Sequence, residues 1–315
     1  MKKKIFIDGS EGTTGLRIHE RFQERDDVEL LVIDPELRKD PEERKRLIQA
    51  SDITFLCLPD AAARESVALA GDAPVRIIDT STAHRTEAGW AYGLPELSAG
   101  HRKAVAEGSR VAVPGCHATG FITLVYPLVQ GGIAAPDYPF SSFSLTGYSG
   151  GGKKMIAEYE GGERAKELDA PREYGLGQQH KHLKEMKHVP GLSREPLFSP
   201  IVADYYSGML VSVPLYGEML TKYRDPQSLR AYLEEFYGGE GLIRVMPEGS
   251  EEAYSGMLAG NTCSGWDGLR IFVCGNKDRL LLNAQFDNLG KGASGAAIQC
   301  LNIMMGCADD KGLHL

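Results

Sequence analysis

The chain has 315 residues, 42% hydrophobic and 25% charged, and its 35 Lys and Arg against 43 Asp and Glu give a net charge of −8. This balance excludes a disordered or collagen-like chain and argues against a nucleic acid or an anionic membrane as partner. No apolar run approaches the roughly 18 residues that span a bilayer, and Asp8 soon interrupts the run after the N-terminal lysines, so no signal peptide is predicted. Six cysteines without a CxxC pair are typical of free thiols in a reducing compartment, so we expect a cytoplasmic protein.

Short apolar segments alternate with charged segments of helical length in the first third of the chain. Asp40 and Pro41 suit the N-cap and the first position of one of these helices. Nearly continuous hydrophobic strands are typical of a parallel sheet covered on both faces, so we predict a Rossmann-like, doubly wound α/β domain. The expected strands are 5–7, 29–33, 53–58, 76–79 and 110–113, and the expected helices are 14–25, 41–50, 61–70 and 96–107.

Strands dominate after a helix expected over 117–130. This pattern predicts an α+β domain with a mostly antiparallel or mixed sheet, followed by a final helix over 292–305. We therefore divide the chain into a dinucleotide-binding domain, 1–116 with about 290–315, and a catalytic and oligomerisation domain, 117–289. The expected strands of the second domain are 142–146, 209–215, 243–246, 269–273 and 280–287.

A glycine-rich turn leads from the first strand into the first helix. Gly9, Gly12 and Gly15, with Thr13 and Thr14 between them, would let backbone N–H groups approach a pyrophosphate at the helix N-terminus. An ordinary strand-to-helix turn is the alternative, because a lone glycine pattern is a weak signal. Asp34 follows Gly15 at the spacing of an acidic residue that binds the ribose of NAD, whereas nearby Arg38 would accept the 2′-phosphate of NADP. Asp34 and Arg38 alone do not decide whether the cofactor is NAD or NADP.

Two further loops have the composition of anion sites. Ser81 and Arg85 follow the strand that ends at Asp79, at the edge where doubly wound sheets bind ligands. Ser149 and Gly150 begin a second glycine-rich loop that ends in two lysines, without the Ser or Thr that an NTPase P-loop requires. Ordinary surface loops have a similar composition.

One cysteine differs from the other five. Cys116 lies between a Pro-Gly turn and the first turn of a helix, where unpaired N–H groups lower a thiol pKa and can hold a developing oxyanion. We predict that Cys116 is a nucleophile and that the other cysteines are packing residues. His180 and His182 are candidate bases, because their spacing in a helix could point one into a site while the other faces solvent or an anion. A solvated basic helix face is an equally good interpretation of this segment. No zinc motif is present, so no metal is expected.

Together these segments resemble the N-acetyl-γ-glutamyl-phosphate reductase family, in particular its shorter form, and more distantly the aspartate-semialdehyde dehydrogenases. The resemblance covers essentially the whole chain, and PGCHATG, YGLPE and NLGKGASGAA are its most specific motifs. The matching segments are GSEGTTG (9–15), STAHR (81–85), YGLPE (92–96), PGCHATG (114–120), SGGGKK (149–154), HKHLKEM (180–186) and NLGKGASGAA (288–297).

The resemblance implies an NADPH-dependent reduction of an acyl phosphate to an aldehyde, in arginine biosynthesis, by a homodimer or homotetramer. It implies that Cys116 carries a thioester, that His182 exchanges a proton and that Glu185 orients it. The longer family form has HRHTPEI where this chain has HKHLKEM, so His180 remains a second choice for the base. Further roles are implied for Arg85 and Ser81 with Ser149 and Gly150 in binding substrate and phosphate, and for Asn288 at the nicotinamide.

Two alternatives stay open at this point. An aspartate- or aminoadipate-type semialdehyde dehydrogenase would use the same machinery on a different substrate. A dinucleotide-binding protein without catalysis is also compatible with a Rossmann-like domain.

Overall fold

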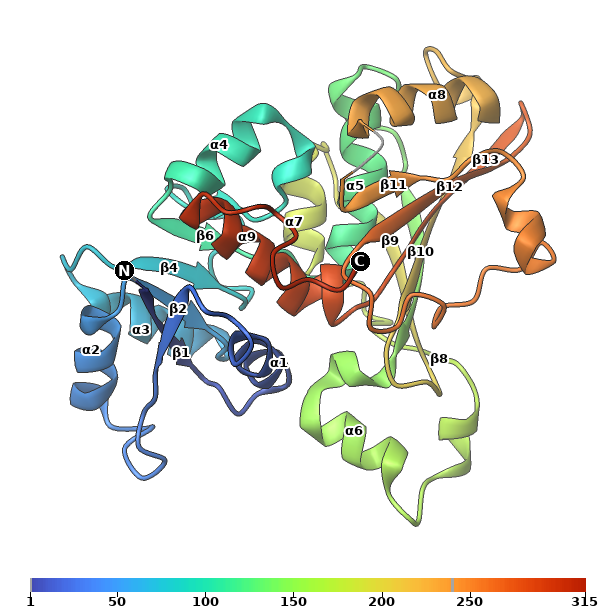
Figure 1. Cartoon of the computed structure of the whole chain (residues 1–315). Coiled ribbons are helices and arrows are strands. Elements are labelled where there is room, and N and C mark those ends of the chain that lie inside the picture. The colour runs from blue at the N-terminus through green and yellow to red at the C-terminus, as the bar shows by residue number, and fades with distance from the viewer. Residues whose placement is uncertain (1, 239–240) are drawn as a thin grey trace. The chain divides into compact units, whose positions relative to one another are not determined.

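The computed structural model describes residues 2–238 and 241–315, which form two compact units (Figure 1). The first unit extends to Pro114 and takes in Ala293–Leu313, and the second comprises Gly115–Gly292 with His314 and Leu315. Gly115 and Cys116, which the sequence prediction kept in the first domain, thus belong to the second unit. None of the helices in the described ranges is both long and apolar enough to cross a membrane.

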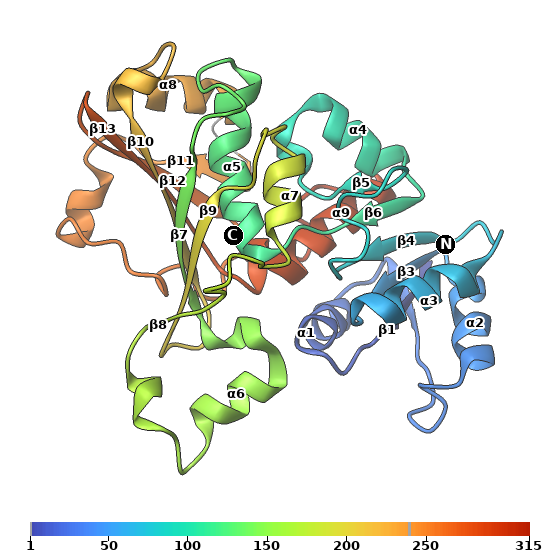
Figure 2. The same ribbon diagram turned by 180° about the vertical axis from the view of Figure 1, so that it is seen from behind.

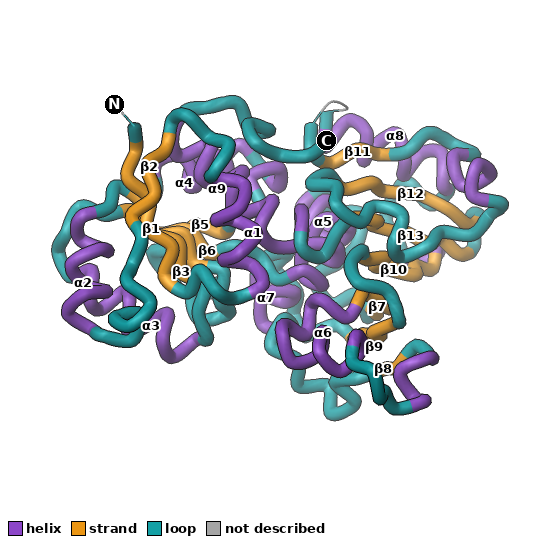
Figure 3. Tube along the Cα trace, turned by 60° about the horizontal axis from the view of Figure 1, so that its bottom comes forward, coloured by secondary structure: helices purple, strands orange, loops and turns teal. Residues whose placement is uncertain are grey.

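A parallel sheet covered on both faces forms the first unit, as the continuous hydrophobic strands predict. One core packs α1 (Thr13–Phe22) and α9 (Gly295–Met305) on the sheet, and another packs α2 (Pro41–Ala50) and α3 (Asp60–Ala70) (Figure 3). The Asp40 side chain caps α2 as predicted, and α4 spans Ala99–Glu107. The strands, in sheet order, are β2 (Val28–Leu31), β1 (Lys3–Asp8), β3 (Ile53–Leu56), β4 (Arg76–Asp79), β6 (Arg110–Ala112) and β5 (Ala91–Tyr92).

A mixed seven-stranded sheet forms the second unit, in agreement with the predicted fold class. The pairs β7–β9 and β11–β12 are parallel and the other pairs are antiparallel. The helices of this unit are α5 (Cys116–Gln130), α6 (Gly152–Glu160), α7 (Leu183–His188) and α8 (Pro226–Tyr237). The strands, in sheet order, are β11 (Ile243–Val245), β12 (Leu269–Gly275), β13 (Arg279–Phe286), β10 (Met209–Tyr216), β7 (Ser141–Gly147), β9 (Leu197–Ala203) and β8 (Arg172–Glu173).

Helix α5 packs tightly on this sheet at a glycine. A Cβ atom added to Gly120 would lie 2.5 Å from Cγ2 of Val211, so no larger residue fits without displacing the core. Figure 2 shows α7 beside α5, and Glu185 of α7 accepts a hydrogen bond from the amide of Gly115, directly before α5. Tight packing on both sides therefore fixes where α5 begins.

Several elements were not predicted from the sequence. They are the short strands β5 and β8, the strand β9, and the helices α6, α7 and α8. β9 contains Pro200, which cannot donate a backbone hydrogen bond and weakens the strand pattern. The predicted helix 96–107 is divided into a 3₁₀ turn, Pro95–Leu97, and α4, because Ser98 caps the latter. The predicted final helix begins as a π-helical turn, Gly290–Ser294.

Candidate active site

Cys116 is the first residue of α5, immediately after the turn that follows β6. The N-cap residue is Gly115, which has no side chain with which to cap the helix. The Cys116 side chain is half-buried, and a Cβ atom added to Gly292 would lie 2.9 Å from the Cys116 Cβ. The thiol thus lies beside the first N–H groups of α5, whose dipoles favour a thiolate.

Three other cysteines have environments that suppress the thiolate, and a fourth is buried. Desolvation raises the pKa of Cys57 to about 12 and that of Cys263 to about 11, and it also raises the pKa of Cys274. Cys300 is buried, in contact with the carbonyl oxygen of Gly93. These contacts support packing roles for the four thiols.

His180 and His182 both contact the turn that carries Cys116. Their ring centroids each lie 5.5 Å from the ring of His117, and 4.7 Å from one another. His182 is buried and His180 is half-buried, and the expectation that one of the pair faces a site and the other solvent or an anion stays a prediction. Both residues precede α7, so a turn brings their rings to the same side, and the His180 Nδ1 accepts a hydrogen bond from the His182 amide at 3.2 Å.

Glu185 is fully buried on α7. Its carboxylate accepts a hydrogen bond from the Gly115 amide at 3.3 Å. This bond joins α7 to the backbone directly before Cys116. Orientation of His182 by Glu185, which the family resemblance implies, remains a prediction.

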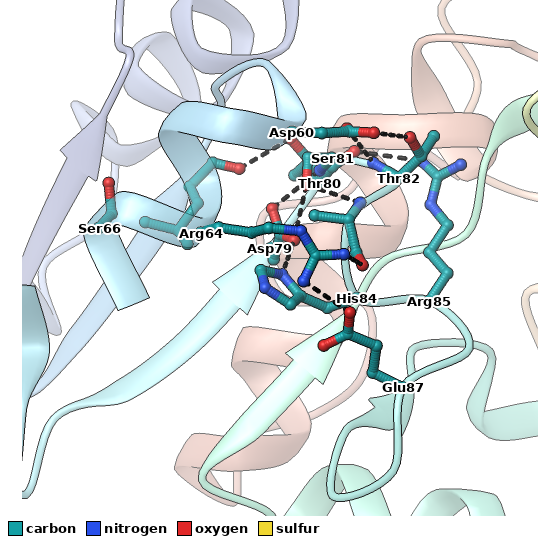
Figure 4. A network of polar contacts seen from close by, with 12 residues as sticks. Asp60, Arg64, Ser66, Asp79, Thr80, Ser81, Thr82, His84, Arg85 and Glu87 are labelled. Carbon is teal, nitrogen blue, oxygen red and sulfur yellow. Dashed lines mark hydrogen bonds and ion pairs between the residues drawn. The ribbon is translucent and has the colours of Figure 1, made fainter. Parts of the chain in front are cut away.

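Arg85 belongs to a loop that a buried carboxylate organises (Figure 4). Asp79, the last residue of β4, accepts hydrogen bonds from the Ser81 amide at 2.9 Å, from the Ser81 hydroxyl at 2.7 Å and from His84 Nδ1 at 2.6 Å. The His84 ring also stacks on Trp90, with centroids 4.1 Å apart. The Ser81 hydroxyl accepts in turn from the Ala83 amide, so its contacts shape the loop.

The Arg85 guanidinium is fixed to the backbone at the same edge. Its Nε donates to the Val113 carbonyl oxygen at 2.9 Å, and one terminal nitrogen donates to the Thr80 carbonyl oxygen at 3.1 Å. On the outer side of the loop, Asp60 accepts from Thr82, and Arg64 donates to the Ala83 carbonyl oxygen (Figure 4). The loop thus holds a cation at the carboxyl ends of β4 and β6, the ligand-binding edge of such sheets.

The glycine-rich turn has the steric features that a pyrophosphate site requires. A Cβ atom on Gly9, which has φ +90°, would lie 2.4 Å from the Cys57 carbonyl oxygen, and one on Gly15 would lie 2.4 Å from the Gly9 carbonyl oxygen. Gly12 is the N-cap of α1 and has no side chain with which to cap the helix. The backbone N–H groups of Thr13 and Thr14 lie in the first turn of α1, where an anion is favoured.

The two candidate ribose-binding residues lie just after β2. Asp34 is exposed and accepts a hydrogen bond from the Glu36 amide at 2.9 Å, and exposed Arg38 forms an ion pair with Glu11 of the glycine-rich turn. Arg38 is therefore held beside this turn.

Asn288 links the second glycine-rich loop to the sheet. Its side-chain amide donates to the Ser149 hydroxyl at 3.1 Å and accepts from the Gly208 amide at 2.8 Å. A Cβ atom on Gly150 would lie 3.5 Å from the Asn288 amide nitrogen. The structure thus brings together Ser149, Gly150 and Asn288.

Sequence reasoning missed two side chains beside Cys116. His117 Nε2 lies 2.7 Å from the Tyr174 hydroxyl, and Nδ1 lies 2.6 Å from the Ser144 hydroxyl. Burial lowers the pKa of His117 to about 3, and desolvation, with a smaller effect of the Cys116 charge, raises the pKa of Tyr174. The position of His117 next to Cys116 was a usable signal, but no local motif marks Tyr174.

Comparison with known proteins agrees with this arrangement. The family described as semialdehyde dehydrogenase, NAD binding domain, matches residues 3–105, and the family described as semialdehyde dehydrogenase, dimerisation domain, matches residues 116–288. N-acetyl-gamma-glutamyl-phosphate reductase 2 of Nostoc sp. is 43% identical over 99% of both chains. N-acetyl-gamma-glutamyl-phosphate reductase of Brucella ovis is 44% identical over 97% of this chain and all of its own.

The chain belongs to the N-acetyl-gamma-glutamyl-phosphate reductase family. Its fold is also that of aspartate-semialdehyde dehydrogenase II from Vibrio cholerae, with a TM-score of 0.74 and 15% sequence identity over 97% of this chain and 99% of the other. As a member of this reductase family, the chain is an oxidoreductase whose first unit binds a nicotinamide dinucleotide.

The hydrogen bonds of the buried Asp79 carboxylate indicate how much stability its removal would cost. We expect Asp79→Ala to lower the free energy of unfolding of the first unit by about 2 to 4 kcal/mol, because Ser81 and His84 lose a buried acceptor. Asp60→Ala, which removes an exposed acceptor from the same loop, should cost no more than about 1 kcal/mol. Urea unfolding followed by Trp90 fluorescence in a Trp266→Phe background measures both, and equal losses would contradict the prediction.

The environments of the thiols predict an order of alkylation. At pH 7.5, roughly one unit below the pKa of an ordinary thiol, iodoacetamide should modify Cys116 before Cys57 or Cys263. Because the raised pKa values of Cys57 and Cys263 leave little thiolate at neutral pH, their modification should increase only as the pH rises towards about 11. Peptide mass spectrometry over time gives the order, and modification of Cys57 ahead of Cys116 would contradict it.

Proposed function

We propose that the protein reduces N-acetyl-γ-glutamyl phosphate to N-acetylglutamate semialdehyde, with NADPH as the hydride donor. Cys116 in the first turn of α5, with two histidines at the same turn, carries this proposal. The names of relatives at 43 and 44% identity support the substrate. We further propose that the enzyme acts in arginine biosynthesis in the cytoplasm, consistent with cysteines that are all free.

Cys116 acts as the nucleophile in this proposal. The thiolate attacks the acyl carbon, the carbon–oxygen bond to phosphate breaks, and inorganic phosphate leaves with the bonding electron pair. A thioester remains on Cys116, and it accepts a hydride at its carbonyl carbon more readily than a carboxylate does. The resulting hemithioacetal then releases the aldehyde and restores the thiolate.

His182 exchanges the proton that these steps require. It protonates the oxygen that becomes negative on reduction and recovers the proton when the aldehyde leaves, an exchange commonly worth about 10² to 10⁴ in rate. The buried position of His182 beside His117 supports this choice over the less buried His180. Arg85, with Ser81 in its loop, binds the phosphate or the carboxylate of the substrate.

The residues of the first unit fit a dinucleotide. Gly9 and Gly15 leave the space that a pyrophosphate needs, and the first turn of α1 offers its N–H groups. Arg38, beside the glycine-rich turn, would bind the 2′-phosphate of NADP, whereas Asp34 would suit NAD. We favour NADP because the family resemblance implies it. Ser149, Gly150 and Asn288 would then lie at the nicotinamide and the substrate, and the cofactor would supply the hydride.

A second copy of the chain is the proposed partner. Phe143, Leu197 and Tyr216 are about half or more exposed, at 50, 69 and 58%. Register places them on one face of the mixed sheet, together with Leu145, Leu210 and Leu281. A patch of this kind on a sheet marks an interaction surface, and the matched dimerisation domain includes these strands. We propose a homodimer or homotetramer assembled through this face.

Loss of the nucleophile separates catalysis from binding. Cys116→Ser should abolish NADPH oxidation with N-acetyl-γ-glutamyl phosphate while the dissociation constant for NADPH, measured by fluorescence, stays the same. In the reverse direction, phosphate and NADP should support oxidation of N-acetylglutamate semialdehyde by the wild type. Activity confined to aspartate or aminoadipate semialdehyde would reject the proposed substrate, and full activity of Cys116→Ser would reject the nucleophile.

The histidine pair can be separated by matched substitutions. His182→Asn should lower kcat by about 10² to 10⁴ and remove the histidine step from the pH dependence of kcat, whereas His180→Asn should keep that step. The opposite result would assign the proton exchange to His180.

The oligomer proposal predicts a change in mass. Phe143→Asp places a charge in the centre of the exposed sheet face, so light scattering after size exclusion should detect a monomer. Leu176→Asp, at a 75% exposed position outside the sheet, is the control and should keep the wild-type mass. A monomeric wild type would refute the oligomer.

A further inference from the structure

The ring of His117 joins a strand of the sheet to the side chain of Tyr174. It is nearly fully buried, and both of its nitrogens are in short hydrogen bonds, Nδ1 to Ser144 on β7 at 2.6 Å and Nε2 to Tyr174 at 2.7 Å. These bonds form a continuous chain from Ser144 to the hydroxyl of Tyr174. Because His117 follows Cys116 directly on α5, the middle member of this chain is the residue next to Cys116 in the sequence.

His117 is neutral at physiological pH. Burial, with smaller effects of His180 and Lys181, lowers its pKa to about 3. A neutral imidazole carries one N–H and one nitrogen that only accepts. Either Ser144 or Tyr174 must therefore donate to the ring, while the other accepts from it.

Burial of Ser144 determines which of the two donates. Its side chain is completely inaccessible, and within residues 2–238 and 241–315 its hydroxyl is hydrogen-bonded to His117 alone. If the ring donated to Ser144, the hydroxyl hydrogen would be buried without an acceptor, which is unfavourable. Ser144 therefore donates to Nδ1, and the ring carries its proton on Nε2 and donates it to the oxygen of Tyr174.

Tyr174 then keeps its own hydrogen for another acceptor. Burial, with a smaller effect of the Cys116 charge, raises the pKa of Tyr174, so the phenol stays protonated at physiological pH, and its hydrogen bond to His117 holds the hydroxyl beside the residue that follows Cys116. Among the described residues its hydrogen-bond partner is His117, which in this arrangement is a donor. The remaining hydrogen is available to a group bound at the Cys116 sulfur.

We infer that Tyr174 donates a hydrogen bond to the carbonyl oxygen of the acyl group carried on Cys116, and that His117 and Ser144 are positioning residues that direct its hydrogen there. This role rests on the proposed thioester chemistry. The oxygen gains negative charge on reduction, so a fixed donor stabilises the transition state more than the ground state.

The position of the His117 proton can be measured without any assay of activity. In protein labelled with ¹⁵N-histidine, the two ring nitrogens of a neutral histidine have distinct shifts that identify the protonated one. We expect one histidine to remain neutral down to about pH 4, with its proton on Nε2, and His117→Gln should remove exactly this signal. A proton on Nδ1 would overturn the inference, even if the substituted protein failed to fold.

Tyr174→Phe tests the donor itself. It should lower kcat on the order of 10²-fold, while the rate of Cys116 alkylation in the free enzyme stays within about twofold, because the donor acts on the acyl group. Tyr232→Phe is the control, since it removes a phenol that donates to the Pro127 carbonyl oxygen at 2.8 Å on α5, and it should keep the wild-type kcat. Unchanged kcat in Tyr174→Phe would overturn the inference.

A double substitution tests the positioning role. His117→Leu removes the hydrogen bond that orients the Tyr174 hydroxyl. Adding Tyr174→Phe to this variant should therefore lower kcat little further, whereas independent structural roles would give additive losses of kcat. Additive losses would therefore overturn the role of His117. If the wild type reduced no acyl phosphate, the proposed function would be wrong, but the assignment of the His117 proton to Nε2 would not be affected.

Discussion

The close approach of α5 to its neighbours is the constraint on which the candidate site depends. Gly120 lies against Val211, Gly292 lies against Cys116, and the Gly115 amide donates to Glu185. Each contact restrains the first turns of the helix from a different direction. A thiol in this position is therefore fixed by backbone packing, which is more rigid than the side-chain torsions that position most nucleophiles.

Burial and charge work together around this turn. Desolvation keeps His117 neutral, so the ring beside the proposed nucleophile adds no positive charge and would not compete with His182 in the proposed proton exchange. In the first unit, by contrast, a buried carboxylate organises a loop that presents a cation, because Asp79 accepts from Ser81 and His84. Thus a buried polar group adds no charge beside Cys116 in the second unit, whereas in the first unit a buried carboxylate supports a loop that presents the charge of Arg85.

Much of the fold follows from local patterns, and the remainder from contacts that no local pattern encodes. The parallel sheet, the α2 cap and the position of Cys116 at a helix start were predictable because hydrophobic runs, an Asp-Pro pair and a Pro-Gly turn are local signals. The strand β8 has two residues and exists only because β9 lies beside it. Tyr174 comes directly after β8, so its place near Cys116 could not be predicted without the sheet.

The return of α9 to the first unit has a consequence for the order of folding. Ile298 and Leu301 of α9 share a core with Ile5 and Ile53, at the opposite end of the chain. During synthesis the first 114 residues leave the ribosome without these partners, and the second unit up to Gly292 is made before they arrive. The nucleotide-binding half is thus the last part of the protein to complete its core, so a chain truncated before residue 295 would leave apolar surface on the sheet uncovered.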